Sequence, residues 1–159
     1  MKIFEIDELS REQVIGFFNF HWGSSKMVIS SGIYDCEELD GFIVVNTENK
    51  LIGLITYIIT NNECEIISLD SIEEEKGIGS LLVQEIENHA VKKKCKRLKL
   101  ITTNDNLLAL KFYQKRGFHL SKIFINAVEK ARKLKPEIPL IGNDGIPIRD
   151  EIELEKLLS

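Results

Sequence analysis

The sequence predicts a single mixed α/β domain over residues 1–159, and three observations support that prediction. The chain of 159 residues is long enough for one domain and short for two. Hydrophobic residues make up 43% and charged residues 29% of it, as in a globular protein with an apolar core. Segments with the two-residue period of strands alternate with segments that have the longer period of helices.

Seven segments are predicted to be strands, because β-branched and other apolar residues dominate them or alternate with polar ones. The clearest pair is residues 51–60 and 63–71, since Asn61 and Asn62 between them form a tight hairpin turn. The other predicted strands are residues 2–6, 41–45, 97–103, 118–125 and 148–157. Residues 21–40 mix serines, glycines and aromatics, so we expect a loop or short helices there.

Four segments are predicted to be helices. The second is the clearest, since Ile78, Leu82, Ile86 and Ala90 recur every four residues and form one apolar face. It starts at Gly77 and ends at the lysine-rich run 92–96; the others are residues 11–20, 107–116 and 126–135. The last of these continues into a loop rich in proline and glycine, and together they form an insert at about 126–147 before the final strand.

Charge and cysteine content argue against several classes of protein. A net charge of −4 is unlike the basic surplus of nucleic-acid binders, so no nucleic-acid partner is expected. The N-terminus lacks the apolar run of a signal peptide, and no uncharged apolar stretch reaches the roughly 18 residues of a membrane helix, so no membrane association is expected. Cys36, Cys64 and Cys95 are widely spaced, which favours free thiols in a reducing cytoplasm and no metal site.

A glycine-rich turn joins a predicted strand to the second predicted helix, with the sequence Gly77-Ile78-Gly79-Ser80. Glycines let the backbone approach a ligand, and the first N–H groups of a helix carry partial positive charge, so this turn can hold a pyrophosphate. A helix start that binds nothing is an equally good interpretation of two glycines alone. The turn is not a Walker loop, because Ser80 and not a lysine follows Gly79, and it lacks the third glycine of a dinucleotide fingerprint.

A second motif runs from Asn106 to Phe118 with the pattern N-x-x-A-x-x-F-Y-x-x-x-G-F, which includes Phe112, Tyr113 and Gly117. With the glycine turn and the order of the predicted elements, this motif resembles the GNAT N-acetyltransferase superfamily, closely over residues 42–118 and loosely elsewhere. The resemblance implies a mixed, mostly antiparallel sheet of six to seven strands flanked by helices. It also implies acetyl-CoA as co-substrate and, because family members often pair, a homodimer.

The resemblance further implies a set of cofactor contacts. The family pattern Gln/Arg-x-x-Gly-x-Gly/Ala matches the glycine turn, but its first position falls on Glu74, a carboxylate whose charge Lys76 would partly offset. Phe112 would pack into the core. Backbone groups near Leu69 would align the acetyl arm. The residues implied to bind the cofactor are Leu69, Ser71, Lys76, Gly77, Ile78, Gly79, Ser80 and Asn106.

Acetyl transfer to an amine needs a proton donor for the departing thiolate and a base for the acceptor. We expect Tyr113 to be the donor, since a phenol can protonate a thiolate; a core tyrosine whose hydroxyl reaches solvent is the alternative. An alkylamine with a pKa near 10.4 is mostly charged at neutral pH, so a base helps. Glu65 is the first candidate and Glu63 the second, because both point to one face of a strand that leads to the glycine turn. Solvated charges at a sheet edge are the alternative for both.

The acceptor is expected to be a primary amine of a small molecule or a peptide. In the family the segment after the first helix shapes the acceptor pocket, which points to His21, Trp22 and Tyr34; ordinary packing is the alternative for each. The insert at about 126–147 is expected to close over this pocket. Two other functions stay open, namely a catalytically inactive module that binds CoA and an acetyltransferase that modifies proteins or RNA.

Overall fold

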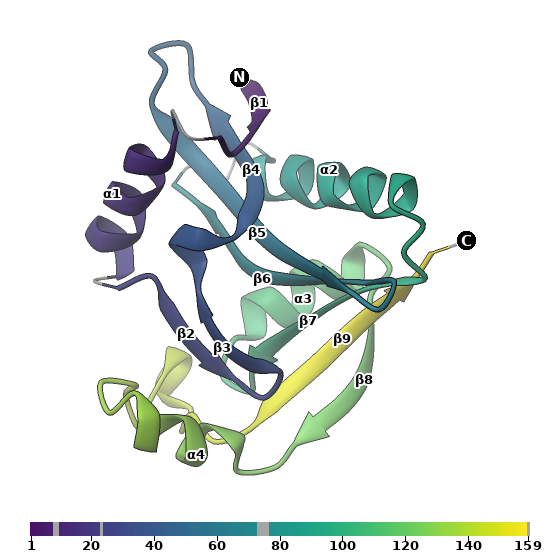
Figure 1. Ribbon diagram of the computed structural model, residues 1–159. Coiled ribbons are helices and arrows are strands. Elements are labelled where there is room, and N and C mark those ends of the chain that lie inside the picture. The colour runs from purple at the N-terminus through teal and green to yellow at the C-terminus, as the bar shows by residue number, and fades with distance from the viewer. Residues whose placement is uncertain (8–9, 23, 73–76, 159) are drawn as a thin grey trace. The chain divides into compact units, whose positions relative to one another are not determined.

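The computed structural model of the chain describes residues 1–7, 10–22, 24–72 and 77–158. Seven strands form one mixed, mostly antiparallel sheet in the order β1-β4-β5-β6-β7-β9-β8, while β2 and β3 form a separate two-stranded sheet (Figure 1). The predicted fold class is therefore confirmed. The strands are β1 (Lys2–Glu5), β2 (Lys26–Ile29), β3 (Gly32–Asp35), β4 (Asp40–Val45), β5 (Leu51–Thr60), β6 (Glu63–Ser71), β7 (Arg97–Thr103), β8 (His119–Phe124) and β9 (Glu151–Leu157).

Four α-helices and two short 3₁₀ helices accompany the strands. The helices are α1 (Arg11–Trp22), α2 (Ile78–Lys92), α3 (Leu107–Lys115), α4 (Ala127–Leu134), η1 (Cys36–Glu38) and η3 (Asn143–Gly145). No helix in the described part of the chain is both long and apolar enough to cross a membrane.

The chain divides into two compact units. The first unit comprises Met1–Lys26, Asp35–Leu98 and Leu158–Ser159, and the second comprises Met27–Tyr34 and Lys99–Leu157. The first unit contains β1, β4, β5 and β6 with helices α1 and α2, and the second contains α3, β8, α4 and β9. The glycine turn belongs to the first unit and the motif that ends at Phe118 to the second.

In the first unit, α2 covers one face of the sheet. Gly53 of β5 makes room for it, since a Cβ at this glycine would lie 2.4 Å from Cγ2 of Ile78 and 3.2 Å from Cδ1 of Leu82. Ile78, Leu82, Ile86 and Ala90 are all fully buried, which confirms the apolar face that their spacing predicts. Burial of these side chains, each worth about 1.5–3 kcal/mol when apolar and large, fixes the helix on the sheet.

The predicted hairpin between β5 and β6 is confirmed. Asn61 and Asn62 have φ values of 51° and 62°, the left-handed region that asparagine tolerates and that a two-residue hairpin turn requires. From this turn the two strands pair from Thr60 and Glu63 up to Tyr57 and Ile66. The register then shifts, because Thr56 pairs with Ser68, so Ile67 is an extra residue in β6 and forms a β-bulge.

Helix α2 connects two strands that start at the same end of the sheet. The N–H of Lys96 donates to the carbonyl of Asn62 at 2.7 Å, and Arg97 pairs with Glu63, so the first residues of β7 lie beside the first residues of β6. A helix between two parallel neighbours is the usual crossover connection, and it returns the chain from the end of β6 to the start of β7.

The second unit contains the predicted insert, which is folded and held by polar contacts. The guanidinium of Arg132 in α4 donates to the carbonyls of Pro139 at 2.8 Å and Ile148 at 2.6 Å. The buried carboxylate of Asp105 accepts the N–H of Asn143 at 3.0 Å. These contacts tie both halves of the insert to residues outside it, so the segment has a defined conformation despite its many loop-forming residues.

The expectation of a loop or short helices over residues 21–40 is wrong in part. Helix α1 continues through Trp22, and residues 26–35 form the hairpin of β2 and β3 before the short helix η1. Each of these two strands has four residues. Strands this short show too few alternations for a two-residue period to emerge from the sequence.

Candidate active site

The glycine turn has the geometry that a backbone anion site needs. Gly77 has φ 70° and ψ 19°, a left-handed conformation that glycine adopts without strain, and it directly precedes the first residue of α2. Among the described residues, nothing lies within 4 Å of a Cβ placed on Gly77. The turn is therefore uncrowded at Gly77, at the end of α2 where the helix dipole is positive.

The start of α2 carries no side-chain cap among the residues that the structure describes. The first hydrogen bond of the helix runs from the N–H of Leu81 to the carbonyl of Gly77 at 3.0 Å. In general, the first N–H groups of an α-helix find no carbonyl partner within the helix itself. Ile78 is fully buried and anchors this end of the helix, whereas Gly79 and Ser80 are half-buried. The arrangement suits a phosphate group.

The remaining predicted cofactor residues of the first unit lie along the chain that leads to this turn. Leu69 and Ser71 are half-buried at the end of β6, paired with Ile55 and Gly53 of β5. The predictions for Lys76 and Glu74 lie outside the described residues.

The two candidate bases on β6 have different environments. They point to one face, as predicted, since Glu63 pairs with Thr60 and Glu65 with Ile58 two residues further along β5. The carboxylate of Glu63 accepts a hydrogen bond from Nε of Arg97 in a partly exposed ion pair. Glu65 is only 7% exposed, so a solvated charge at a sheet edge does not describe it. A buried carboxylate is rare in proteins, and it marks Glu65 as the stronger candidate.

The bulge at Ile67 brings further polar groups to the face that holds Glu65. Simple alternation would put Glu65 and Ser68 on opposite faces, but pairing of Thr56 with Ser68 places Ser68 on the same face as Glu65 and the far side from α2. Sequence reasoning missed this polar face, because a β-bulge depends on the paired strand as well as on residues 63–71. The signal that was available is the run of polar residues at every second position after it, Ser68 and Asp70.

A buried hydroxyl pair lies beside the bulge. The oxygens Oγ1 of Thr56 and Oγ of Ser68 are 2.6 Å apart, and Thr56 is fully buried. The thiol of Cys36, also fully buried, contacts both hydroxyls. Burial raises the pKa of the Cys36 thiol to about 11, while the hydrogen bonds to Thr56 and Ser68 act in the opposite direction. These contacts connect η1 to the sheet beside the β-bulge at Ile67.

In the second unit, two neighbouring aromatics of α3 differ in burial, and the expectation that Phe112 packs into the core is wrong in part. Tyr113 is 6% exposed, and its ring packs edge-on against Phe112 at 5.0 Å and Phe118 at 5.3 Å between centroids. Phe112, expected in the core, is half-buried beneath the guanidinium of Arg116, 3.6 Å from its ring centroid. The physical reason is that the apolar face of α3 is centred on Tyr113, which leaves Phe112 at its margin.

Asn106 caps α3, as its position before the helix predicts. Its Oδ1 accepts the N–H of Ala109 at 3.1 Å. At the other end of the helix Gly117 has φ 93°, and the N–H of Phe118 donates to the carbonyl of Tyr113 at 3.1 Å. The two ends of the motif from Asn106 to Phe118 therefore cap the start and the end of α3.

The candidate acceptor residues lie on different elements. His21 and Trp22 are the last two residues of α1 in the first unit. Tyr34 lies in β3 of the second unit, where its hydroxyl donates to Oγ of Ser31 at 3.0 Å. Within the described ranges, no group of three or more acidic, histidine or cysteine side chains is arranged to hold a metal ion.

Comparisons with known proteins agree with this architecture. The sequence model of the acetyltransferase (GNAT) family matches residues 5–118. Protein YxbD of Bacillus subtilis (strain 168) is 54% identical over 158 residues, which cover 99% of each chain. The IAA acetyltransferase from Bacillus cereus ATCC 14579 has a TM-score of 0.73 at 20% identity, over 99% of each chain. A Bacillus subtilis acetyltransferase crystallised in complex with CoA has a TM-score of 0.71 at 19% identity, again over 99% of each chain.

Proposed function

Because the chain belongs to the acetyltransferase (GNAT) family, we propose that it is an acetyl-CoA-dependent N-acetyltransferase that acts on a primary amine of a small molecule or peptide. The observation that carries the proposal is the start of α2. Among the described residues, it has a left-handed glycine, no atom within 4 Å of a Cβ placed on that glycine, and no side-chain cap. A structural neighbour was crystallised with CoA, which supports the same choice of cofactor.

The residues at the start of α2 fit the diphosphate of such a cofactor. Backbone N–H groups from Gly77 to Ser80 would bind the diphosphate, since a helix start combines hydrogen-bond donors with the positive end of the dipole. Backbone groups of Leu69 and Ser71, at the end of the preceding strand, would hold the arm that carries the thioester. Lys76 and Asn106 complete the proposed set. The bound cofactor supplies an activated acetyl group.

Proton transfer is assigned to two side chains in this proposal. Glu65, as a buried carboxylate, would take the proton from the ammonium of the acceptor, and Glu63 is the second candidate for that role. The hydroxyl of Tyr113 would hold the proton that the departing thiolate needs. The acceptor would be bounded by His21, Trp22 and Tyr34, with the insert at about 126–147 as its cover.

The proposal also includes the cellular location of the enzyme and its oligomeric state. Cys36, Cys64 and Cys95 are buried free thiols, which is consistent with a cytoplasmic protein. A homodimer is part of the same proposal. The net charge of −4 favours a small or peptide amine over RNA as the acceptor.

A second candidate function is a CoA-binding module without catalytic activity. The observation in its favour is the burial of Tyr113 between two aromatic rings, which is also what a purely structural tyrosine would show. The two functions agree on the cofactor and differ only in whether an amine consumes the thioester.

Turnover of acetyl-CoA with a panel of amines separates these functions. If the protein is an enzyme, release of the CoA thiol should depend on the amine. Tyr113→Phe should then lower kcat by about 10²-fold, the usual size of a general-acid contribution, with little change in KM for acetyl-CoA. Thermal unfolding of Tyr113→Phe controls for damage to the fold. Tight CoA binding by the wild type with no amine-dependent thiol release would establish the binding module instead.

A further inference from the structure

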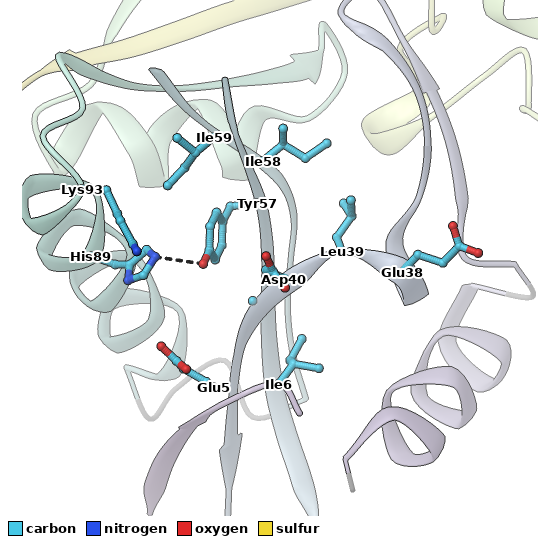
Figure 2. A pocket seen from close by; sticks show the side chains of 11 residues that line it. Glu5, Ile6, Glu38, Leu39, Asp40, Tyr57, Ile58, Ile59, His89 and Lys93 are labelled. Carbon is cyan, nitrogen blue, oxygen red and sulfur yellow. Dashed lines mark hydrogen bonds between the residues drawn. The ribbon is translucent and has the colours of Figure 1, made fainter. Parts of the chain in front are cut away.

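A cavity of about 600 Å³ lies in the first unit at the C-terminal end of α2, the end opposite Gly77 (Figure 2). The 15 residues of α2 separate this cavity from the proposed cofactor site by about 22 Å along the helix axis, at 1.5 Å per residue. Its volume falls in the range of about 300–1,000 Å³ that small-molecule sites occupy. None of the candidate active-site residues lines it.

The rings of Tyr57 and His89 form an aromatic part of the cavity lining. The hydroxyl of Tyr57 and Nε2 of His89 are hydrogen-bonded at 2.9 Å, as the dashed line in Figure 2 shows. Phe42 stacks on Tyr57 with 6.2 Å between centroids and meets His89 edge-on at 5.6 Å. Because Phe42 contacts both rings and they contact each other, Tyr57 and His89 are held in place before any ligand arrives, and they present an aromatic surface to the cavity.

The rim of the cavity is negatively charged. Three acidic residues, Glu5, Glu38 and Asp40, contribute to its lining, together with one basic residue, Lys93. Glu5 and Asp40 have no ion-pair partner within the part of the chain that the structure describes. The C-terminal end of α2, which supplies His89 and Lys93, adds the negative end of the helix dipole. The cavity therefore attracts cations.

The charges of Asp40 and Glu5 reach the ring of Tyr57. The pKa of Tyr57 is raised to about 12, first by burial of the phenol and next by Asp40, with a smaller contribution from Glu5. The same field that disfavours a phenolate favours a positive charge beside the ring. An ammonium in this position would contact the carboxylates and the face of an aromatic ring together, an arrangement that proteins use for amines.

Apolar side chains complete the cavity. Ile6, Ile58 and Ile59 contribute to its lining, next to the charged rim. A ligand that matches both parts has a cationic head for Asp40 and Glu5 and a hydrocarbon body for the isoleucines. We propose that this cavity is a second binding site, and that its ligand is a small alkylammonium compound. The site does not depend on the proposed function, because none of the residues assigned to that function lines it.

Titration of the full-length protein with putrescine tests this proposal, without acetyl-CoA so that no acetyl transfer takes place. We expect saturable binding by calorimetry, and at least a fivefold weaker affinity in Asp40→Asn, since an amine loses a charged partner. Lys93→Met should bind at least as tightly as the wild type, because it removes a cation from the described lining of the cavity. Glu48→Gln, a carboxylate in the turn before β5, is the matched control and should not change the affinity.

Nuclear magnetic resonance of the histidine rings locates the bound amine. The chain has three histidines, and putrescine should shift the ring signals of His89 alone. Succinate, a dianion of similar length, should shift none. The proposal is overturned if putrescine does not bind, if Asp40→Asn binds it as well as the wild type, or if Glu65→Gln abolishes binding while Asp40→Asn does not. That last outcome would place the amine at the proposed acceptor site and leave the proposed function standing.

Discussion

The two faces of the sheet formed by β5 and β6 in the first unit differ in the polarity of their side chains. On the face toward α2, Gly53 lies against the apolar side chains of Ile78 and Leu82, and one hydrogen bond, between Tyr57 and His89, lies toward the other end of the helix. On the other face, the same two strands present Glu65, the hydroxyls of Thr56 and Ser68, and Asp70, with the thiol of Cys36 against them. Several of these polar groups are more than nine-tenths buried.

This difference separates residues that stabilise the fold from residues that the fold positions. Apolar burial on the α2 face stabilises the unit by itself. A buried carboxylate or hydroxyl contributes little net stability even when it is hydrogen-bonded, and apolar residues of similar size would serve packing as well. Polar groups at such positions are typical of sites that carry chemistry, so we locate the function of β6 on the face opposite α2.

The largest effect is expected at Glu65. Glu65→Gln keeps the size of the side chain and removes the base, so kcat should fall by about 10²–10⁴-fold while the stability toward urea changes little. Steady-state kinetics with a saturating amine gives the measurement. Glu63→Gln is the matched control on the same face, and it should lose less than about tenfold because its carboxylate is already paired with Arg97. A larger loss in Glu63→Gln than in Glu65→Gln would reverse the assignment.

A smaller effect, on stability, is expected at the bulge. Thr56→Val removes a fully buried hydroxyl that lies 2.6 Å from that of Ser68, so both Ser68 and the Cys36 thiol lose a hydrogen-bond partner. The free energy of unfolding should fall by about 1–3 kcal/mol, and the double variant with Ser68→Ala should recover part of that loss. Urea unfolding measures both values. Strictly additive losses in the double variant would mean that the two hydroxyls do not act together.

The smallest effect is a pH dependence caused by the buried thiols. Burial raises the pKa of Cys36 to about 11 and that of Cys64 to about 12, from an ordinary value of 9.0. The folded state therefore holds these protons more tightly than the unfolded state does, and the stability they contribute is complete below pH 9 and is lost as the pH rises through 11. The urea midpoint should fall between pH 9 and 11, by less in Cys36→Ala. At pH 8 a thiol reagent should label the native chain slowly and the unfolded chain at once; rapid labelling of native Cys36 would contradict this account.

Local signals predicted most of the fold. The strands at β5 and β6 and the apolar face of α2 emerge from periodicity, and Asn61, Asn62 and Gly117 sit at the positive φ values that turns and helix ends require. The hairpin of β2 and β3 was missed, because its strands are too short for a period to show.

The candidate site was less predictable from the sequence. Position along a strand put Glu63 and Glu65 on one face, but only the structure distinguishes the paired carboxylate from the buried one. The polar face of β6 depends on one extra residue in the register, Ile67, whose effect involves the pairing partner and is absent from the strand's own sequence. Similarly, the cavity beside Tyr57 gathers residues from β1, β4, β5 and α2 that no local motif connects.

The proposed function requires that the start of α2 binds the diphosphate of the cofactor. Calorimetric titration with CoA and with pantetheine, which lacks the diphosphate, tests it directly in the wild type and in Gly77→Val. Gly145→Val is the matched control, because Gly145 has φ 73° and equally open surroundings. We expect the wild type and Gly145→Val to bind CoA at least tenfold more tightly than pantetheine. Gly77→Val should lose this preference. Equal binding of CoA and pantetheine by the wild type would contradict binding of the diphosphate at the start of α2.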